Sequence, residues 1–164
     1  RVGIARALGL GPRLIVADEP VSALDVSVRS QILNLMTELR ERLDLSYLFV
    51  SHDLSVIRFV SHRVAVMYLG RLAEVAPTDE LFKRPLHPYT QALMAAIPTI
   101  GDGSASIFDQ PERLLEGELP NPIDLPRGCR FAGRCPFRFD RCAEEEPELK
   151  EVETGHTVAC YLYE

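Results

Sequence analysis

Lysine is scarce in this sequence: its 164 residues include only Lys83 and Lys150. Each follows a large apolar residue rather than glycine. Neither can therefore belong to a Gly-Lys-Ser/Thr loop, in which backbone amides and a lysine ammonium surround nucleotide phosphates. The sequence predicts that this chain alone neither binds a nucleoside triphosphate tightly nor hydrolyses it.

Surplus positive charge and long apolar runs are also lacking. The formal net charge is -6, which excludes a protein that binds nucleic acid by neutralising its phosphates. No apolar run approaches the roughly 20 residues that span a bilayer, and the start has no signal-peptide pattern. The sequence begins at Arg1, already inside an apolar-periodic segment, so we expect a soluble, cytoplasmic piece of a longer protein.

Helix-like and strand-like segments alternate up to about residue 76, as in an α/β domain. Continuous apolar runs predict strands that are covered on both faces, and apolar spacing of three or four residues predicts helices. The expected strands are 14–17, 47–50, 64–68 and 72–75, and the expected helices are 2–8, a long one through residue 43, and 54–60. We expect a mostly parallel sheet with helices, followed by a small irregular extension.

The composition changes after Ala76, because ten of the twelve prolines and all four cysteines lie beyond it. We therefore expect two domains, residues 1–76 and residues 77–164. Early in the second, Thr78 is expected to be a helix N-cap. Pro88 is expected to begin a helix that runs through Ile97.

Two neighbouring acids, Asp18 and Glu19, end the first expected strand, at the sheet edge where open α/β folds bind ligands. In ATP-hydrolysing proteins one such acid orients the water shell of Mg²⁺, and the other polarises the attacking water. On its own, the dipeptide favours two acids that only cap a buried strand, and the motifs that follow reverse this preference.

Two further motifs follow in order: Ser22-Ala23-Leu24-Asp25 before the long helix, and Ser51-His52-Asp53 after the next strand. With the opening RVGIARAL, these motifs resemble the Walker B, D-loop, H-switch and post-signature helix of ABC-transporter ATPases. The resemblance implies ATP and Mg²⁺ as ligands. It implies that Asp18 holds Mg²⁺ through water, that Glu19 is the catalytic base and that His52 senses the γ-phosphate. Ser22 and Asp25 would line the nucleotide site and contact a second ATPase subunit.

The run Arg84-Pro85-Leu86-His87-Pro88-Tyr89-Thr90 resembles the element that opens the C-terminal extension of ATPase subunits in oligopeptide and dipeptide importers. Apart from that resemblance, the run predicts a helix start with an aromatic ring packed inward. We assign it this structural role, and His87 no catalytic one.

Four cysteines with intervals of six, seven and eighteen residues follow: Cys129, Cys135, Cys142 and Cys160. A cytoplasmic location disfavours disulfides and favours a metal site, but the intervals fit no standard zinc ribbon. Four thiolates complete a [4Fe-4S] cluster, as the resemblance to these importers also implies. Zinc, with His156 in place of one thiolate, and unligated thiols remain alternatives. Five nearby arginines would offset the negative charge of a cluster: Arg127, Arg130, Arg134, Arg138 and Arg141.

The resemblance implies the ATP-hydrolysing subunit of a peptide importer, held at the cytoplasmic face of the membrane by permease subunits and supplied by a peptide-binding protein. One alternative is a non-catalytic metal-cluster or oligomerisation module. Another is an ABC ATPase for a different cargo, such as nickel, glutathione, sugars or muropeptides. Because the cargo is bound elsewhere, the sequence does not choose among cargoes.

Overall fold

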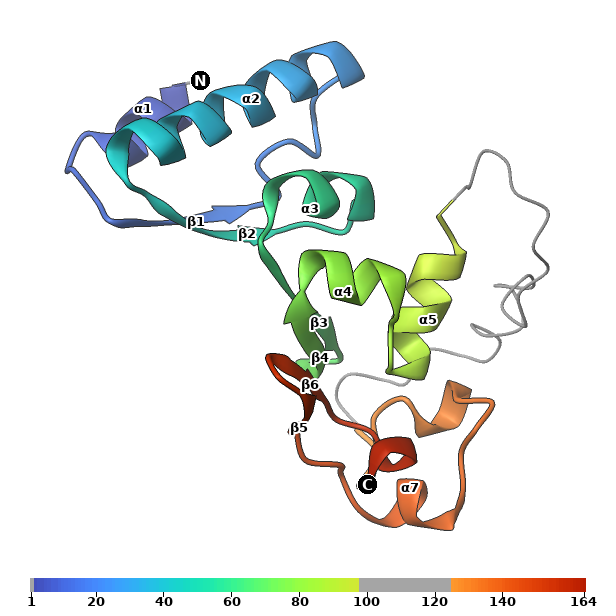
Figure 1. The fold of residues 1–164 in the computed structure, drawn as a ribbon. Helices are drawn as coiled ribbons and strands as arrows, with labels where there is room; N and C mark the ends of the chain where they lie inside the picture. Colours follow the sequence, from blue (N-terminus) through green and yellow to red (C-terminus); the bar gives the residue numbers. More distant parts are fainter. Residues whose placement is uncertain (1, 98–124) are drawn as a thin grey trace. The chain divides into compact units, whose positions relative to one another are not determined.

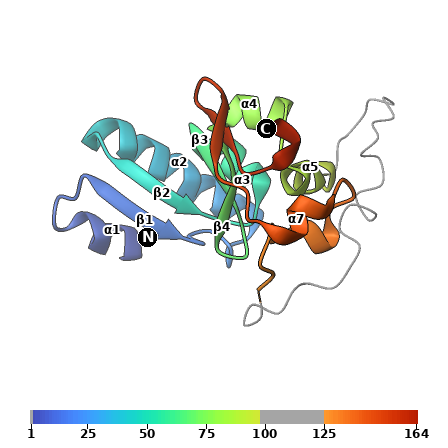
Figure 2. The same ribbon diagram turned by 90° about the horizontal axis from the view of Figure 1, so that it is seen from below.

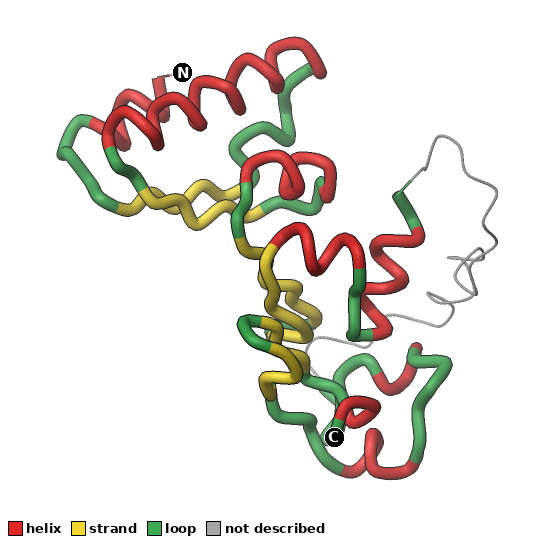
Figure 3. Tube along the Cα trace, viewed as in Figure 1, coloured by secondary structure: helices red, strands yellow, loops and turns green. Residues whose placement is uncertain are grey.

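A computed structural model describes residues 2–97 and 125–164 of the chain. Its contacts divide the chain into two compact units, Arg1–Ser61 and His62–Glu164. Each unit contains its own sheet, drawn in yellow in Figure 3. Within the described ranges, no helix is both long enough and apolar enough to cross a membrane. The division into domains at residues 76 and 77 stays a prediction.

The first unit is a parallel pair of strands with three helices (Figure 1). Its elements in chain order are α1 (Val2–Leu8), β1 (Leu14–Asp18), α2 (Val26–Leu43), β2 (Ser46–Val50) and α3 (Leu54–Val60). β1 and β2 pair in register from Leu14 opposite Ser46 to Asp18 opposite Val50. The carboxyl ends of both strands therefore lie at the same edge.

The core of this unit lies on one face of the strand pair. Its buried side chains come from the strand, the turn and the helices: Ala17, Val21, Ile32, Leu33, Met36 and Val56. The other face carries four exposed apolar side chains, at Leu14, Val16, Leu48 and Val50. The apolar runs are typical of strands covered on both faces, but in the described residues one face stays exposed, because neighbouring strand residues point to opposite faces and the helices of the unit cover only one.

The second unit is built on an antiparallel sheet with the strand order β3-β4-β6-β5, in which β3 and β4 lie side by side (Figure 2). Its strands are β3 (Arg63–Tyr68), β4 (Arg71–Pro77), β5 (Lys150–Glu153) and β6 (His156–Val158). Leu69 and Gly70 form the turn between β3 and β4, and both have positive φ. This tight turn reverses the chain and forces antiparallel pairing. The expected α/β class is confirmed, but most of the described strand residues are antiparallel rather than parallel.

Two helices, α4 (Thr78–Lys83) and α5 (Pro88–Ala95), contact β4. Thr78 is the first residue of α4 and not its N-cap, because the cap position is occupied by Pro77, which offers no side-chain hydrogen bond. Pro88 begins α5 as predicted, although the helix ends at Ala95 and not at Ile97. After residue 124 the chain forms two short 3₁₀ turns, Ala132–Arg134 and Tyr161–Tyr163, and the short helix α7 (Asp140–Glu144).

Candidate nucleotide site and cysteine cluster

The expected acid and histidine meet at the carboxyl edge of the strand pair. The backbone N–H of Glu19 donates to the carbonyl of Val50 at 2.9 Å, which extends the β1–β2 ladder by one residue. Oε1 of Glu19 then lies 2.6 Å from Nδ1 of His52. Two residues that are 33 positions apart are thus joined because β1 and β2 run in parallel and end together.

The backbone of Glu19 holds this side chain in place. Its φ of 47° lies in the left-handed region, which is uncommon for a residue other than glycine. Such conformations cluster at functional sites, where the surrounding structure sustains them. A carboxylate only accepts hydrogen bonds, so Nδ1 of His52 donates and Nε2 is left as an acceptor. His52 is 79% exposed, so this nitrogen is accessible to a ligand.

The residues of the Ser22–Asp25 turn make contacts of their own. The hydroxyl of Ser22 donates to the carbonyl of Glu19 at 3.0 Å. Asp25 caps α2 by accepting from the backbone N–H of Val28 at 2.9 Å. This backbone bond, aided by one from the hydroxyl of Ser27, lowers the pKa of Asp25. The structure therefore brings Ser22 next to Glu19, while the Asp25 carboxylate is engaged in holding the helix start.

Arg29 pairs with Asp53 of the Ser51-His52-Asp53 motif, a contact that the sequence reasoning missed. Nη1 of Arg29 on α2 lies 2.8 Å from Oδ2 of Asp53, the residue after His52. Asp53 also caps α3, and the bond from the Ser55 hydroxyl is the main reason that its pKa is lowered. An Asp before an apolar helical run is an N-cap signal that would have identified this residue. Arg29 also donates to the carbonyl of Leu24, so it links the two motifs.

The four cysteines line a single small cavity of about 20 Å³ in the second unit. The N–H of Cys129 donates to the carbonyl of Cys142 at 2.8 Å, which joins the two segments. All four thiols are free. Burial raises the pKa of Cys129 and Cys135, and it raises the pKa of Cys160 to about 11. Among the described residues, no group of three or more His, Cys, Asp or Glu side chains is arranged to hold a metal ion.

One alternative for the surroundings of this cavity is wrong. His156 does not replace a thiolate, because its Nε2 lies 2.7 Å from Oε1 of Glu74 and both side chains are buried. Two of the five arginines expected to offset the charge of a cluster are engaged in ion pairs. Arg130 pairs with Glu146, and Arg141 pairs with two acidic side chains, those of Glu145 and Glu164. These carboxylates already balance charge on the two arginines.

The structural role expected for the His-Pro-Tyr run is confirmed. Nδ1 of His87 accepts from the N–H of Tyr89 at 3.0 Å and so caps α5. The ring of Tyr89 packs 4.7 Å from that of Tyr68 and 5.5 Å from that of Phe131. His87 is 3% exposed, and its burial lowers its pKa to about 4.

Comparison with known proteins agrees with these motifs. Residues 73–142 match the family described as oligopeptide/dipeptide transporter, C-terminal region. The chain is 55% identical over 165 residues to the oligopeptide transport ATP-binding protein AppF of Bacillus subtilis, with 99% of this chain and 49% of that protein covered. It is 52% identical over 162 residues to the probable peptide ABC transporter ATP-binding protein y4tS of Sinorhizobium fredii, with 99% of this chain and 45% of that protein covered.

The chain thus spans about half the length of the curated relatives that it matches. Residues 73–142 are similar to the C-terminal region of oligopeptide/dipeptide transporters, and nearly the whole chain is similar to the ATP-binding proteins of such transporters, as its motifs predicted.

Proposed function

We propose that the chain is the C-terminal part of an ATP-hydrolysing subunit of an ABC importer for oligopeptides or dipeptides. The observation that carries this proposal is the 2.6 Å contact between Glu19 and His52 at the shared edge of β1 and β2. It joins a carboxylate suited to polarising water with an imidazole whose Nε2 faces solvent and, once protonated, could donate a hydrogen bond to a phosphate oxygen.

The residues present fit one part of an ATP–Mg²⁺ site. Asp18 ends β1 with an exposed side chain, so its carboxylate is available to water molecules bound to Mg²⁺. The metal, when bound, neutralises charge on the β- and γ-phosphates. The chain has no Gly-Lys-Ser/Thr loop, so residues of the longer protein must surround the phosphates. This chain alone is expected to be inactive.

The same proposal assigns partners and a location. Ser22 is exposed beside Glu19, in a turn that would face a second ATPase subunit across the nucleotide. Permease subunits would hold the pair at the cytoplasmic face of the membrane, and a binding protein would deliver the peptide. These assignments rest on the names of the relatives, which are ATP-binding proteins of peptide transport.

Steady-state hydrolysis by the full-length protein in its transporter complex tests the catalytic assignment. We expect Glu19→Gln and His52→Ala each to lower kcat by about 100-fold or more, as for the loss of a general base or a transition-state donor. Glu41→Gln, on the exposed side of α2, is the matched control and should leave the rate unchanged. Equal rates for wild type and Glu19→Gln would refute the assignment.

We also propose that the four cysteines hold a [4Fe-4S] cluster. The support is that all four line one cavity, with the donor set that such clusters use. The cavity of about 20 Å³ has room for about one water molecule, so the thiols would have to move apart. An anaerobic preparation should contain iron and sulfide in matching amounts, and Cys142→Ser should lose both. Zinc alone would refute the cluster.

A further inference from the structure

A second pocket of the His62–Glu164 unit shares four lining residues with the cysteine cavity, namely His87, Cys129, Phe131 and Pro147. The functions proposed above use none of its other residues. The pocket has a volume of about 520 Å³, within the range of about 300–1,000 Å³ that is typical of small-molecule sites. Its walls come from the β3–β4 turn, the Cys129–Phe131 segment and the residues before β5. Buried side chains line it, among them those of Tyr68, Phe131 and His87.

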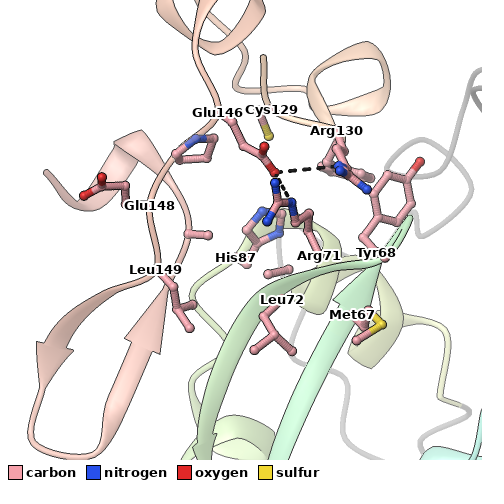
Figure 4. Close-up of a pocket in the computed structure, with 15 residues that line it drawn as sticks. Met67, Tyr68, Arg71, Leu72, His87, Cys129, Arg130, Glu146, Glu148 and Leu149 are labelled. Carbon is pink, nitrogen blue, oxygen red and sulfur yellow. Dashed lines mark ion pairs between the residues drawn. The ribbon is translucent and has the colours of Figure 1, made fainter. Parts of the chain in front are cut away.

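Two arginines of this pocket converge on one carboxylate oxygen (Figure 4). Nε of Arg71 lies 3.0 Å from Oε1 of Glu146, and Nε of Arg130 lies 3.6 Å from the same atom. Arg130 also donates to the carbonyl of Leu69, which fixes its position. The remaining acid of the pocket, Glu148, is directed away from this group (Figure 4). Two guanidinium groups thus share one carboxylate, which leaves each of them N–H donors that Glu146 does not occupy.

Arg71 is the member of this group that a ligand can reach. The Glu146 carboxylate contacts Nε of Arg71, on one edge of the guanidinium. The rest of the guanidinium is accessible, because the Arg71 side chain is 62% exposed. A guanidinium held at one edge presents its remaining N–H donors in a fixed plane, and these donors match the two oxygens of a carboxylate. Below it, Leu72, Leu149 and Met67 form an apolar wall (Figure 4), and they are 39%, 40% and 58% exposed.

We propose that this pocket binds a small carboxylate with an apolar substituent, such as the free carboxyl terminus of a short apolar peptide. The carboxylate of the ligand binds Arg71, and its apolar group packs on the apolar wall formed by Leu72, Leu149 and Met67. The site is independent of the nucleotide chemistry proposed for Asp18, Glu19 and His52, and its test uses no ATP.

Titration calorimetry of this chain with acetyl-leucyl-leucine tests the proposal, with acetyl-leucyl-leucine amide as the matched probe without a charge. For about 20 non-hydrogen atoms we expect a dissociation constant of roughly 0.1–1 mM for the acid. The amide should bind about tenfold more weakly or not at all, because a hydrogen-bonded charge is lost.

Arg71→Gln should weaken binding of the acid by about tenfold. Arg84→Gln is the control, since Arg84 is also exposed and paired with a glutamate, Glu153, but lies outside the pocket. Chemical shift changes should be centred on residues 67–73 and 146–149. No binding of the acid, equal binding of acid and amide, or equal weakening by both substitutions would overturn the proposal. The proposal would also be overturned if acetyl-leucyl-leucine did not bind but a longer peptide acid did. That result would indicate the carboxyl terminus of a protein as the ligand.

Discussion

Oε1 of Glu19 and Nδ1 of His52 lie 2.6 Å apart, so the carboxylate selects one tautomer of the ring. With the proton on Nδ1, the neutral ring keeps Nε2 as its acceptor and presents that atom to solvent. A ring without this partner is free to carry its proton on either nitrogen.

Glu19→Ala should therefore change the tautomer of His52. We expect ¹⁵N chemical shifts of the ring, measured near pH 8, to report the Nδ1–H form in the wild-type chain and a mixed population in the variant. Glu41→Ala, which removes a carboxylate from the surface of α2, should leave the shifts unchanged. A mixed population already present in the wild type would mean that the Glu19 contact does not orient the ring.

Arg29 and Asp53 should be energetically coupled. Their 2.8 Å ion pair joins α2 to the start of α3, and each side chain is about 30% exposed. We expect a coupling energy of about 1 kcal/mol in a double-mutant cycle of Arg29→Met and Asp53→Asn. Asparagine preserves the N-cap of α3 while removing the charge, so the cycle isolates the ion pair. Urea unfolding measures the four stabilities.

The exposed pair of Arg42 and Glu38, one turn apart on α2, is the reference for that cycle. Its coupling should be at most about 0.5 kcal/mol. Equal coupling in both cycles would mean that the Arg29 pair contributes no more than an ordinary surface contact.

The order of elements up to residue 77 could be predicted from the sequence, because apolar runs and helix caps are local signals. The strands β5 and β6 could not be predicted. β5 is mostly charged, since its sequence is Lys150-Glu151-Val152-Glu153. These strands form because β6 pairs with β4, about 80 residues earlier. The same pairing brings His156 to Glu74, a contact that no local pattern indicates.

The meeting of Glu19 and His52 could be expected from the sequence, because parallel strands end at one edge. The Arg29–Asp53 pair could not. It depends on which face of α2 turns toward the start of α3, and that orientation is fixed by packing on the core and not by sequence spacing.

Glu74 should be essential to the fold of the second unit. It is fully buried, pairs with His156, and accepts from the backbone N–H groups of Leu86 and His87 at 2.8 and 2.9 Å. Glu74→Ala leaves these donors and the imidazole without their partner, so we expect a loss of about 3 kcal/mol or more. Glu153→Ala, which removes an exposed ion pair with Arg84, should cost less than about 1 kcal/mol.

Hydrogen exchange provides a direct readout of the Glu74 contacts. The amides of Leu86 and His87 should lose protection in Glu74→Ala and keep it in Glu153→Ala. Protected amides in Glu74→Ala would show that another acceptor replaces the carboxylate.

The second unit should lose stability in mild acid because of His87. Burial lowers the pKa of this ring to about 4, below its usual value of 6.5, so between these values the unfolded chain binds more protons than the folded one. The neutral His87 ring makes its full contribution to the free energy of unfolding above pH 6.5. This contribution falls as the pH drops toward 4, and it amounts to about 3 kcal/mol at most. His87→Asn keeps a capping acceptor without a titrating ring. It should flatten this part of the curve of unfolding free energy against pH, whereas an unchanged slope would assign the acid lability to another group.

The exposed face of the β1–β2 pair should make the isolated chain associate. Leu14, Val16, Leu48 and Val50 lie together on this face and are 57%, 62%, 56% and 46% exposed, and contiguous apolar surface of this kind seeks a partner. Light scattering should report a mass that rises with protein concentration.

The double variant Val16→Lys, Leu48→Lys should remain a monomer at the same concentrations, because two charges on the face oppose its burial. Val26→Lys replaces an isolated apolar side chain that is 77% exposed at the start of α2, so it should associate like the wild type. A wild-type chain that is monomeric at all concentrations would mean that the strand face is not the surface through which the chain associates.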